Sequence, residues 1–145
     1  MCFKKKTSQG IKIDRRKVPG LPVDEDFSKA IDIFIEECSK TLDRQKVETS
    51  IKKITIEWWN DIAPSPSTGV LNTVVVYCDQ IYSGLTTGNL CRVAWRGKLY
   101  RSAFAHEILH VVGQDVLNDS DGDHNNRQLW DIELLINQKL TNINL

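Results

Sequence analysis

Apolar residues recur at two different periods along this chain, and these periods predict its elements. Between residues 24 and 45 they fall three and four positions apart, which places them on one face of an amphipathic helix. Residues 52–59 and 90–97 alternate between apolar and polar positions, as strands with one buried face do. Residues 71–82 are rich in β-branched and aromatic side chains, and we expect a buried strand there.

Helical spacing returns in the last third of the chain. The apolar positions of residues 101–113 and 125–140 predict two further helices. Ser102 is a residue type that caps a helix N-terminus, and Gly113 is a type that follows a helix C-terminus. We therefore expect the first of these two helices to run between them.

The remaining segments predict connections and a tail. Residues 60–69 contain two Pro, two Ser and one Gly, which indicates a loop, and residues 84–89 are expected to turn the chain. Residues 1–20 are basic and poor in apolar side chains, so we expect a mostly extended tail before one domain at residues 21–145. The order of elements predicts an α+β fold with a small mixed sheet, in which residues 90–96 form an edge strand.

Composition and charge limit the classes of function. The 145 residues are 41% hydrophobic and 26% charged, which is typical of a globular domain. Lys and Arg number 19, as do Asp and Glu, and this balance argues against nucleic acid as a partner. No apolar run approaches the roughly 18 residues that a membrane-spanning helix needs. We expect a monomer whose partner is a peptide or protein.

The four cysteines do not form a metal-binding pattern such as C-x-x-C. Cys78 and Cys91 fall in two strands expected to be neighbours, so a disulfide between them stays open. The start Met1–Cys2, followed by lysines, resembles a bacterial lipoprotein whose signal peptide is replaced by an initiator Met. That resemblance implies a lipid on Cys2 and a place in the cell envelope. The alternative is a cytoplasmic chain in which Cys2 has no special role.

All three histidines of the chain lie within residues 106–124. His106 and His110 are four positions apart on the helix expected at residues 101–113, so both rings project from one face and can bind one ion. With Glu107 they form H-E-x-x-H, the pattern in which two His bind zinc and the Glu acts as general base towards a metal-activated water.

The third zinc ligand is less clearly marked. In the pattern H-E-x-x-H-x-x-G-x-x-H a third His follows the Gly, but this chain has Val116 at that position. His124 is favoured, because neutral imidazole suits zinc and because the polar residues before it can return the chain over the helix. Glu133, Asp115 and Asp121 are the other candidates.

The stretch from Ala105 to Trp130 resembles the zincin metallopeptidases, and in particular small bacterial zincin-like proteins that have D-x-D-H and a nearby Trp after H-E-x-x-H. The resemblance covers about residues 102–130 in detail and the preceding helix and strands only in their order. It implies His106, His110 and His124 as zinc ligands and Glu107 as the catalytic base.

These observations predict a zinc-dependent endopeptidase. The alternative is a non-catalytic zinc-binding surface protein on the same scaffold. The substrate is expected to add as an extended strand to the edge at residues 90–96. A donor to the oxyanion is not identified, with Tyr82, Tyr100 and Arg96 as candidates. The aspartates near His124 do not fit a calcium loop, and one of them is expected to orient a zinc-binding His.

Overall fold

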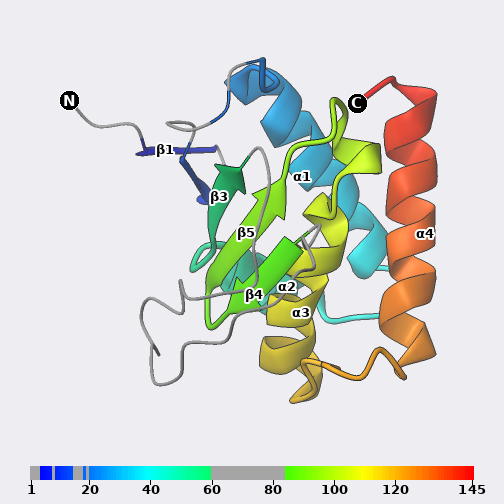
Figure 1. The fold of residues 1–145 in the computed structure, drawn as a ribbon. Helices are drawn as coiled ribbons and strands as arrows, with labels where there is room; N and C mark the ends of the chain where they lie inside the picture. Colours follow the sequence, from blue (N-terminus) through cyan, green and yellow to red (C-terminus); the bar gives the residue numbers. More distant parts are fainter. Residues whose placement is uncertain (1–3, 8, 15–17, 19, 60–83) are drawn as a thin grey trace.

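The computed structural model describes residues 4–7, 9–14, 18, 20–59 and 84–145 (Figure 1). These residues form a five-stranded mixed sheet in the order β1-β2-β3-β5-β4 and four α-helices, which confirms the predicted α+β class. The strands are β1 (Lys4–Lys6), β2 (Lys12–Asp14), β3 (Thr55–Trp59), β4 (Gly84–Thr87) and β5 (Leu90–Ala94). The helices are α1 (Asp24–Cys38), α2 (Arg44–Ile51), α3 (Phe104–Leu117) and α4 (Arg127–Asn142), with a short 3₁₀-helix at Leu99–Arg101.

The helix predicted at residues 24–45 is two helices. The first, α1, ends at Cys38, and the second, α2, begins at Arg44. Asp43 is the reason for the new start, because its carboxylate accepts a hydrogen bond from the backbone N–H of Lys46 at 2.9 Å and caps the first turn of α2. Among the described helices none is long and apolar enough to cross a membrane.

The order of strands corrects two predictions. β5 pairs with β3 on one side and with β4 on the other, so residues 90–96 are not the edge of the sheet. The edge beside β5 is β4, which forms from residues expected to be part of a turn. The turn itself is limited to two residues, because Thr87 already pairs with Leu90 and Gly88 supplies the left-handed conformation that a tight hairpin needs (φ 59°).

The basic segment at the start of the chain belongs to the sheet where it is described. β1 pairs with β2, and β2 pairs in parallel with β3. Ile11 and Ile13 are buried while Lys12 between them is exposed, which is the alternation of a strand with one buried face. The two described strands of this segment are extended, as expected of residues 1–20, but Ile11 and Ile13 anchor the second one in the core.

Several predictions fall outside the described residues. They are the strand at 71–82, the loop at 60–69, the lipid on Cys2, the partner thiol Cys78 and the candidate donor Tyr82. Cys91, the other member of the cysteine pair whose disulfide the sequence leaves open, is a buried free thiol.

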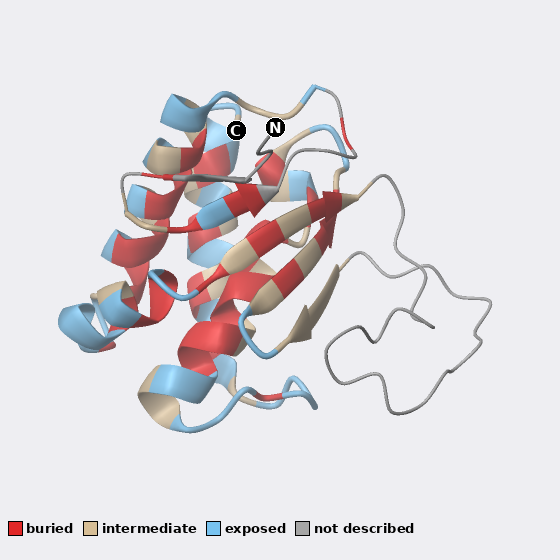
Figure 2. Cartoon of the chain, turned by 90° about the vertical axis from the view of Figure 1, so that its left-hand side faces the viewer, coloured by how far each residue is buried: buried red, intermediate tan, exposed pale blue. Residues whose placement is uncertain are grey.

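The helices pack on one face of the sheet and enclose the core (Figure 2). The side chains of Phe27 on α1, Trp58 on β3 and Phe104 on α3 meet there, with ring centroids 5.8 to 6.5 Å apart. α3 lies against β4 and β5, and α4 packs on α1 and α3 (Figure 1). This arrangement fixes one face of α3 in the core and leaves the other beside the hairpin of β4 and β5.

Candidate metal centre

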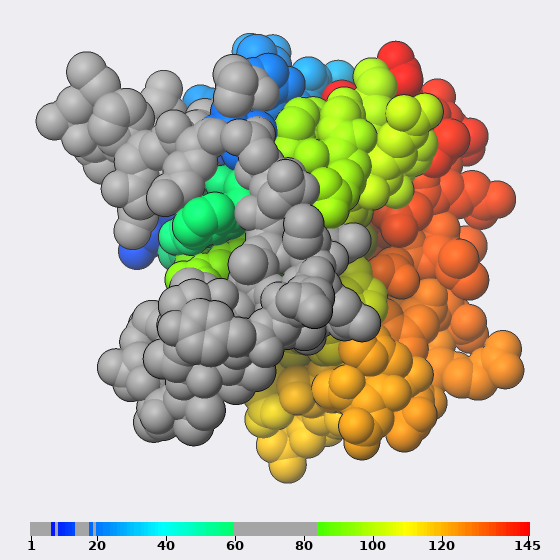
Figure 3. Space-filling view, viewed as in Figure 1, coloured from blue at the N-terminus to red at the C-terminus, as the bar shows by residue number. Residues whose placement is uncertain are grey.

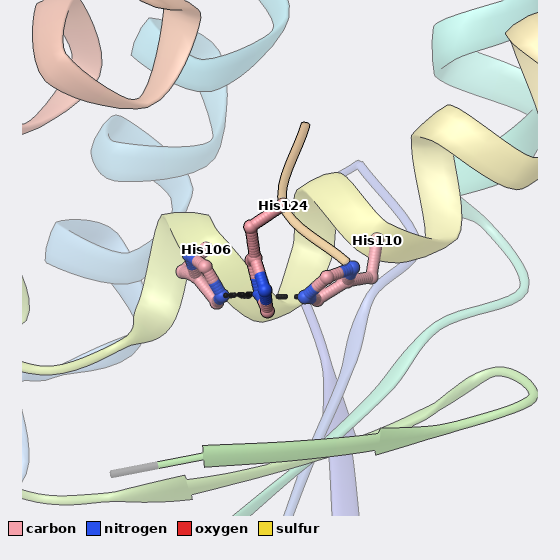
Figure 4. A group of neighbouring side chains, drawn as sticks. All are labelled: His106, His110 and His124. Carbon is pink, nitrogen blue, oxygen red and sulfur yellow. Dashed lines mark hydrogen bonds between the residues drawn. The ribbon is translucent and has the colours of Figure 1, made fainter. Parts of the chain in front are cut away.

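The three histidines converge at one point beside α3 (Figure 4). His106 and His110 project from successive turns of α3, and His124 comes from the connection between α3 and α4. Nε2 of His106 lies 3.2 Å from Nε2 of His110 and 3.0 Å from Nε2 of His124. The three side chains are close enough to bind a metal ion, since one ligand atom from each lies within 4.8 Å of the others.

α3 is longer than predicted, and this sets where the connection begins. Ser102 does not cap it, because the helix starts at Phe104 and the Ser102 hydroxyl accepts from the N–H of Arg96. Gly113 lies inside α3, which ends instead at the left-handed Asn118 (φ 54°). The extra turn carries the chain past His110 before it reverses towards α4.

Asp121 organises the connection rather than joining the three histidines. Its carboxylate accepts hydrogen bonds from the backbone N–H groups of Asn125 (2.9 Å) and Asn126 (2.7 Å) and from Nε1 of Trp130 (2.6 Å). Its backbone carbonyl accepts from the N–H of His124 at 2.9 Å. Burial raises the pKa of Asp121, but these donors outweigh it and leave the pKa below its usual value. The result is a tight turn that presents His124 to α3.

The outer ring nitrogens have partners that set the tautomers. Nδ1 of His110 lies 2.6 Å from the carbonyl oxygen of Ser120, and Nδ1 of His106 lies 2.8 Å from Oε2 of Glu133. Both partners are acceptors, so each Nδ1 carries a proton and each neutral ring directs the lone pair of Nε2 inward. His106 and His110 thus each offer an Nε2 lone pair, as metal-binding histidines do, on the side from which His124 approaches.

Two of the three nitrogen separations are compatible with a tetrahedral zinc site. With Zn–N distances of about 2.0–2.1 Å and tetrahedral angles, two ligand nitrogens lie about 3.3 Å apart, close to the separations of 3.0 and 3.2 Å. Glu133 was a candidate ligand, but it contacts the outer nitrogen of His106, as residues that orient metal ligands do. Burial lowers the pKa of His106, and Glu133 outweighs that effect and raises it. Asp115, another candidate, instead accepts from Ser50 Oγ at 2.7 Å.

Glu107 lies beside the three imidazoles and is almost completely buried, with 5% of its surface exposed. Its Oε2 is 3.9 Å from Nε2 of His106, and its Oε1 accepts a hydrogen bond from the Thr86 hydroxyl at 2.6 Å. Burial raises the pKa of Glu107, although Thr86 and the histidines oppose that rise. The carboxyl group is thus adjacent to the candidate ligands without being one of the converging groups.

A cavity of about 1080 Å³ opens onto these groups. It is lined by residues of β4, of α3 and of the connection between α3 and α4. In Figure 3 this connection lies at the lower end of the molecule, next to α3. Neither Tyr100 nor Arg96 is among its described lining residues. Arg101 is the described cationic side chain that lines it.

Three contributions to the site were not predicted from the sequence. Thr86 was expected in a turn, and Glu133 was considered only as a ligand. The ring of Trp130 stacks on His106 with centroids 4.6 Å apart and 22° between the planes. Trp130 and Glu133 are three positions apart on α4, and that spacing is the one sequence signal that could have paired them.

No protein-family model, curated protein or solved structure matches the chain. The described site itself combines three convergent imidazoles, a buried carboxyl group beside them, and a cavity bordered by the last strand of the described sheet.

Proposed function

We propose that this protein is a zinc-dependent endopeptidase of the zincin class. The observation that carries the proposal is the convergence of three histidine nitrogens within 4.8 Å of one another, with Oε2 of Glu107 3.9 Å from one of them. A cavity meets this group of side chains, which gives a substrate access to it. The match of His106, Glu107 and His110 to H-E-x-x-H adds independent support from the sequence.

His106, His110 and His124 would hold the metal. Zinc binds imidazole nitrogen well, whereas Mg²⁺ and Ca²⁺ prefer oxygen ligands. Among the described residues, three side chains and no fourth offer a ligand atom at this point, and three protein ligands are typical of catalytic rather than structural zinc. When bound, zinc supplies Lewis acidity, which polarises a carbonyl group and makes water more acidic. Glu133 and the carbonyl of Ser120 hold the two rings on α3 in the binding orientation.

Glu107 would move the proton. A carboxylate beside the metal ligands can take a proton from the attacking water and pass it to the nitrogen of the leaving amine. Burial favours this role, because it raises the pKa of the Glu107 carboxyl group, and a general base works best when its pKa lies closer to the working pH.

The substrate would bind as an extended strand along β4. β4 is the last strand of the described sheet on this side, and Gly84, Leu85 and Thr86 line the cavity. Unpaired N–H and C=O groups at a sheet edge can bind a peptide backbone whatever its side chains. This replaces residues 90–96 as the expected binding edge, since β5 is paired on both sides.

Metal content and peptide cleavage test the proposal. Purified protein reconstituted with zinc should hold about one equivalent, and a mixed peptide library read by mass spectrometry should show cleavage. Glu107→Gln should keep the zinc and lose about 10²- to 10⁴-fold in rate. Glu36→Gln, an exposed acid on α1, is the matched control and should cleave as the wild type does.

Two results would contradict the proposal. One is zinc-loaded wild type that cuts nothing in the library, which would favour a zinc-binding protein without catalysis. The other is equal cleavage by the wild type and Glu107→Gln, which would remove Glu107 from the mechanism.

A further inference from the structure

Residues 84 and 86 of β4 face α3 and contact the same side chain. Alternate residues of a strand project from the same face, so Gly84 and Thr86 share the face that meets Glu107. The Thr86 hydroxyl lies 2.6 Å from Oε1 of Glu107 and 3.2 Å from its backbone carbonyl oxygen. The hydroxyl has one proton, and the shorter distance assigns it to the carboxylate.

The backbone carbonyl of Glu107 has a second donor, the thiol of Cys91, so it does not need the Thr86 hydroxyl. Sγ of Cys91 lies 3.5 Å from the carbonyl oxygen of Glu107 and donates to it. Burial raises the pKa of the Cys91 thiol, so it keeps the proton that it donates. The backbone carbonyl of Glu107 therefore has a donor of its own, and Thr86 serves the carboxylate.

Gly84 supplies the space in which the carboxylate lies. A Cβ atom at residue 84 would lie 2.6 Å from Cγ, 2.8 Å from Cδ and 2.7 Å from Oε2 of Glu107. Side chains do not approach so closely, so any other residue at position 84 would displace Glu107. The atoms that clash belong to the Glu107 side chain and not to the backbone, so the side chain is what must move.

We propose that Thr86 and Gly84 are positioning residues for Glu107, so that β4 both receives the substrate and holds the general base beside His106. The inference rests on the proposed function, and its geometric part concerns Glu107 alone. Thr86 fixes one carboxyl oxygen, and the absence of a side chain at Gly84 lets the other lie 3.9 Å from Nε2 of His106. A substrate paired with β4 would then meet a base already in position.

Two substitutions at Thr86 and one control on α2 test this role. Thr86→Val removes the hydroxyl at nearly constant shape, and Thr86→Ser keeps it. Thr49→Val is the matched control, because Thr49 is an exposed threonine of α2 and is not among the described residues lining the cavity. Thr86→Val should lose about 10- to 100-fold in kcat, the loss expected for one hydrogen bond to a charged group. KM should stay within about 2-fold, Thr86→Ser should keep most of kcat, and Thr49→Val should match the wild type.

Gly84→Ala provides a second approach that leaves the hydroxyl in place. It should fold and bind zinc as the wild type does, because neither the ligands nor the backbone need to move. It should nevertheless lose kcat, because its Cβ displaces the carboxyl group of Glu107.

Two measurements do not depend on peptide cleavage. Zinc affinity, determined by competition with a chromophoric chelator, should be the same in all four variants and the wild type. The carboxyl carbon resonance of Glu107, assigned by its loss in Glu107→Gln, should shift in Thr86→Val and Gly84→Ala but not in Thr49→Val. If the wild type cleaves nothing and these shifts appear, the proposed function fails and the positioning contact stands. If Thr86→Val leaves both the resonance and kcat unchanged, or Thr86→Ser fails to keep kcat, the positioning role is wrong.

Discussion

The substitution Gly113→Ala places a methyl group where α3 meets the connection that carries His124. Gly113 is buried and lies one turn after His110. A Cβ there would lie 2.5 Å from the backbone carbonyl oxygen of Asp119 and 2.8 Å from Cδ1 of Leu129. Leu129 can rotate, but a carbonyl oxygen moves only with its backbone. Relief of the clash therefore requires the connection to shift away from α3.

The energetic terms have opposite signs, and the structure decides which is larger. In an exposed helix the change from Gly to Ala stabilises by about 0.8–1.0 kcal/mol. Here an ordinary contact of 3.4 Å requires a displacement of about 0.9 Å from the 2.5 Å clash, and overpacking of this kind costs about 1–3 kcal/mol. The shift also weakens the hydrogen bond from the N–H of Asp119 to the carbonyl of Gly113, which is 3.1 Å long and stabilises by about 0.5–1.5 kcal/mol. We expect a net loss of about 1–3 kcal/mol.

Zinc affinity should fall with stability, because metal sites tolerate distance errors of only about 0.2 Å. Urea unfolding of the zinc-free protein measures the first effect, and chelator competition measures the second. Gly122→Ala is the control, since a Cβ at that position of the same connection meets no atom within 4 Å, and it should unfold as the wild type does. A Gly113→Ala protein that is about 1 kcal/mol more stable and binds zinc normally would refute the argument.

Other predictions concern the ligands and a buried carboxylate. His124→Ala removes a proposed zinc ligand and should weaken zinc binding more than Glu133→Ala. Glu133→Ala removes only the partner of His106 Nδ1 and should weaken binding about 10- to 100-fold. Equal affinities in the two variants would contradict this order. Burial raises the pKa of Glu37, but Lys40 at 2.6 Å and Lys139 at 3.1 Å outweigh it and leave the pKa below its usual 4.5. That contribution to stability is complete above about pH 4.5 and is lost as pH falls through the lower folded-state pKa. Glu37→Gln should therefore be less stable than the wild type by about 1 kcal/mol at pH 7, a value discounted for the exposure of both lysines. In urea unfolding near pH 3 this difference in stability should shrink. A difference that does not depend on pH would show that the charge of Glu37 does not contribute.

Local periodicity was enough to predict the parts of the site that lie on one element. His106 and His110 share a face of α3 because four residues are close to one helical turn, whatever surrounds the helix. The start of α1 at Asp24, the strand at β3 and the course of α4 also followed from the spacing of apolar residues. For His124 the type of ligand and a family resemblance favoured the residue that the structure brings to the other two.

The tertiary structure decided what depends on neighbours distant in sequence. Residues 84–87, whose sequence predicts part of a turn, form strand β4 because they pair with β5. That pairing places Thr86 beside Glu107. Glu133 contacts His106 only because α4 packs on α3. Gly113 by itself predicts the end of a helix, yet α3 continues through it to Leu117. The connection between α3 and α4 lies where a side chain at residue 113 would be. Propensity is a property of a few adjacent residues, whereas strand order, orienting contacts and close approaches are set by which elements pack together.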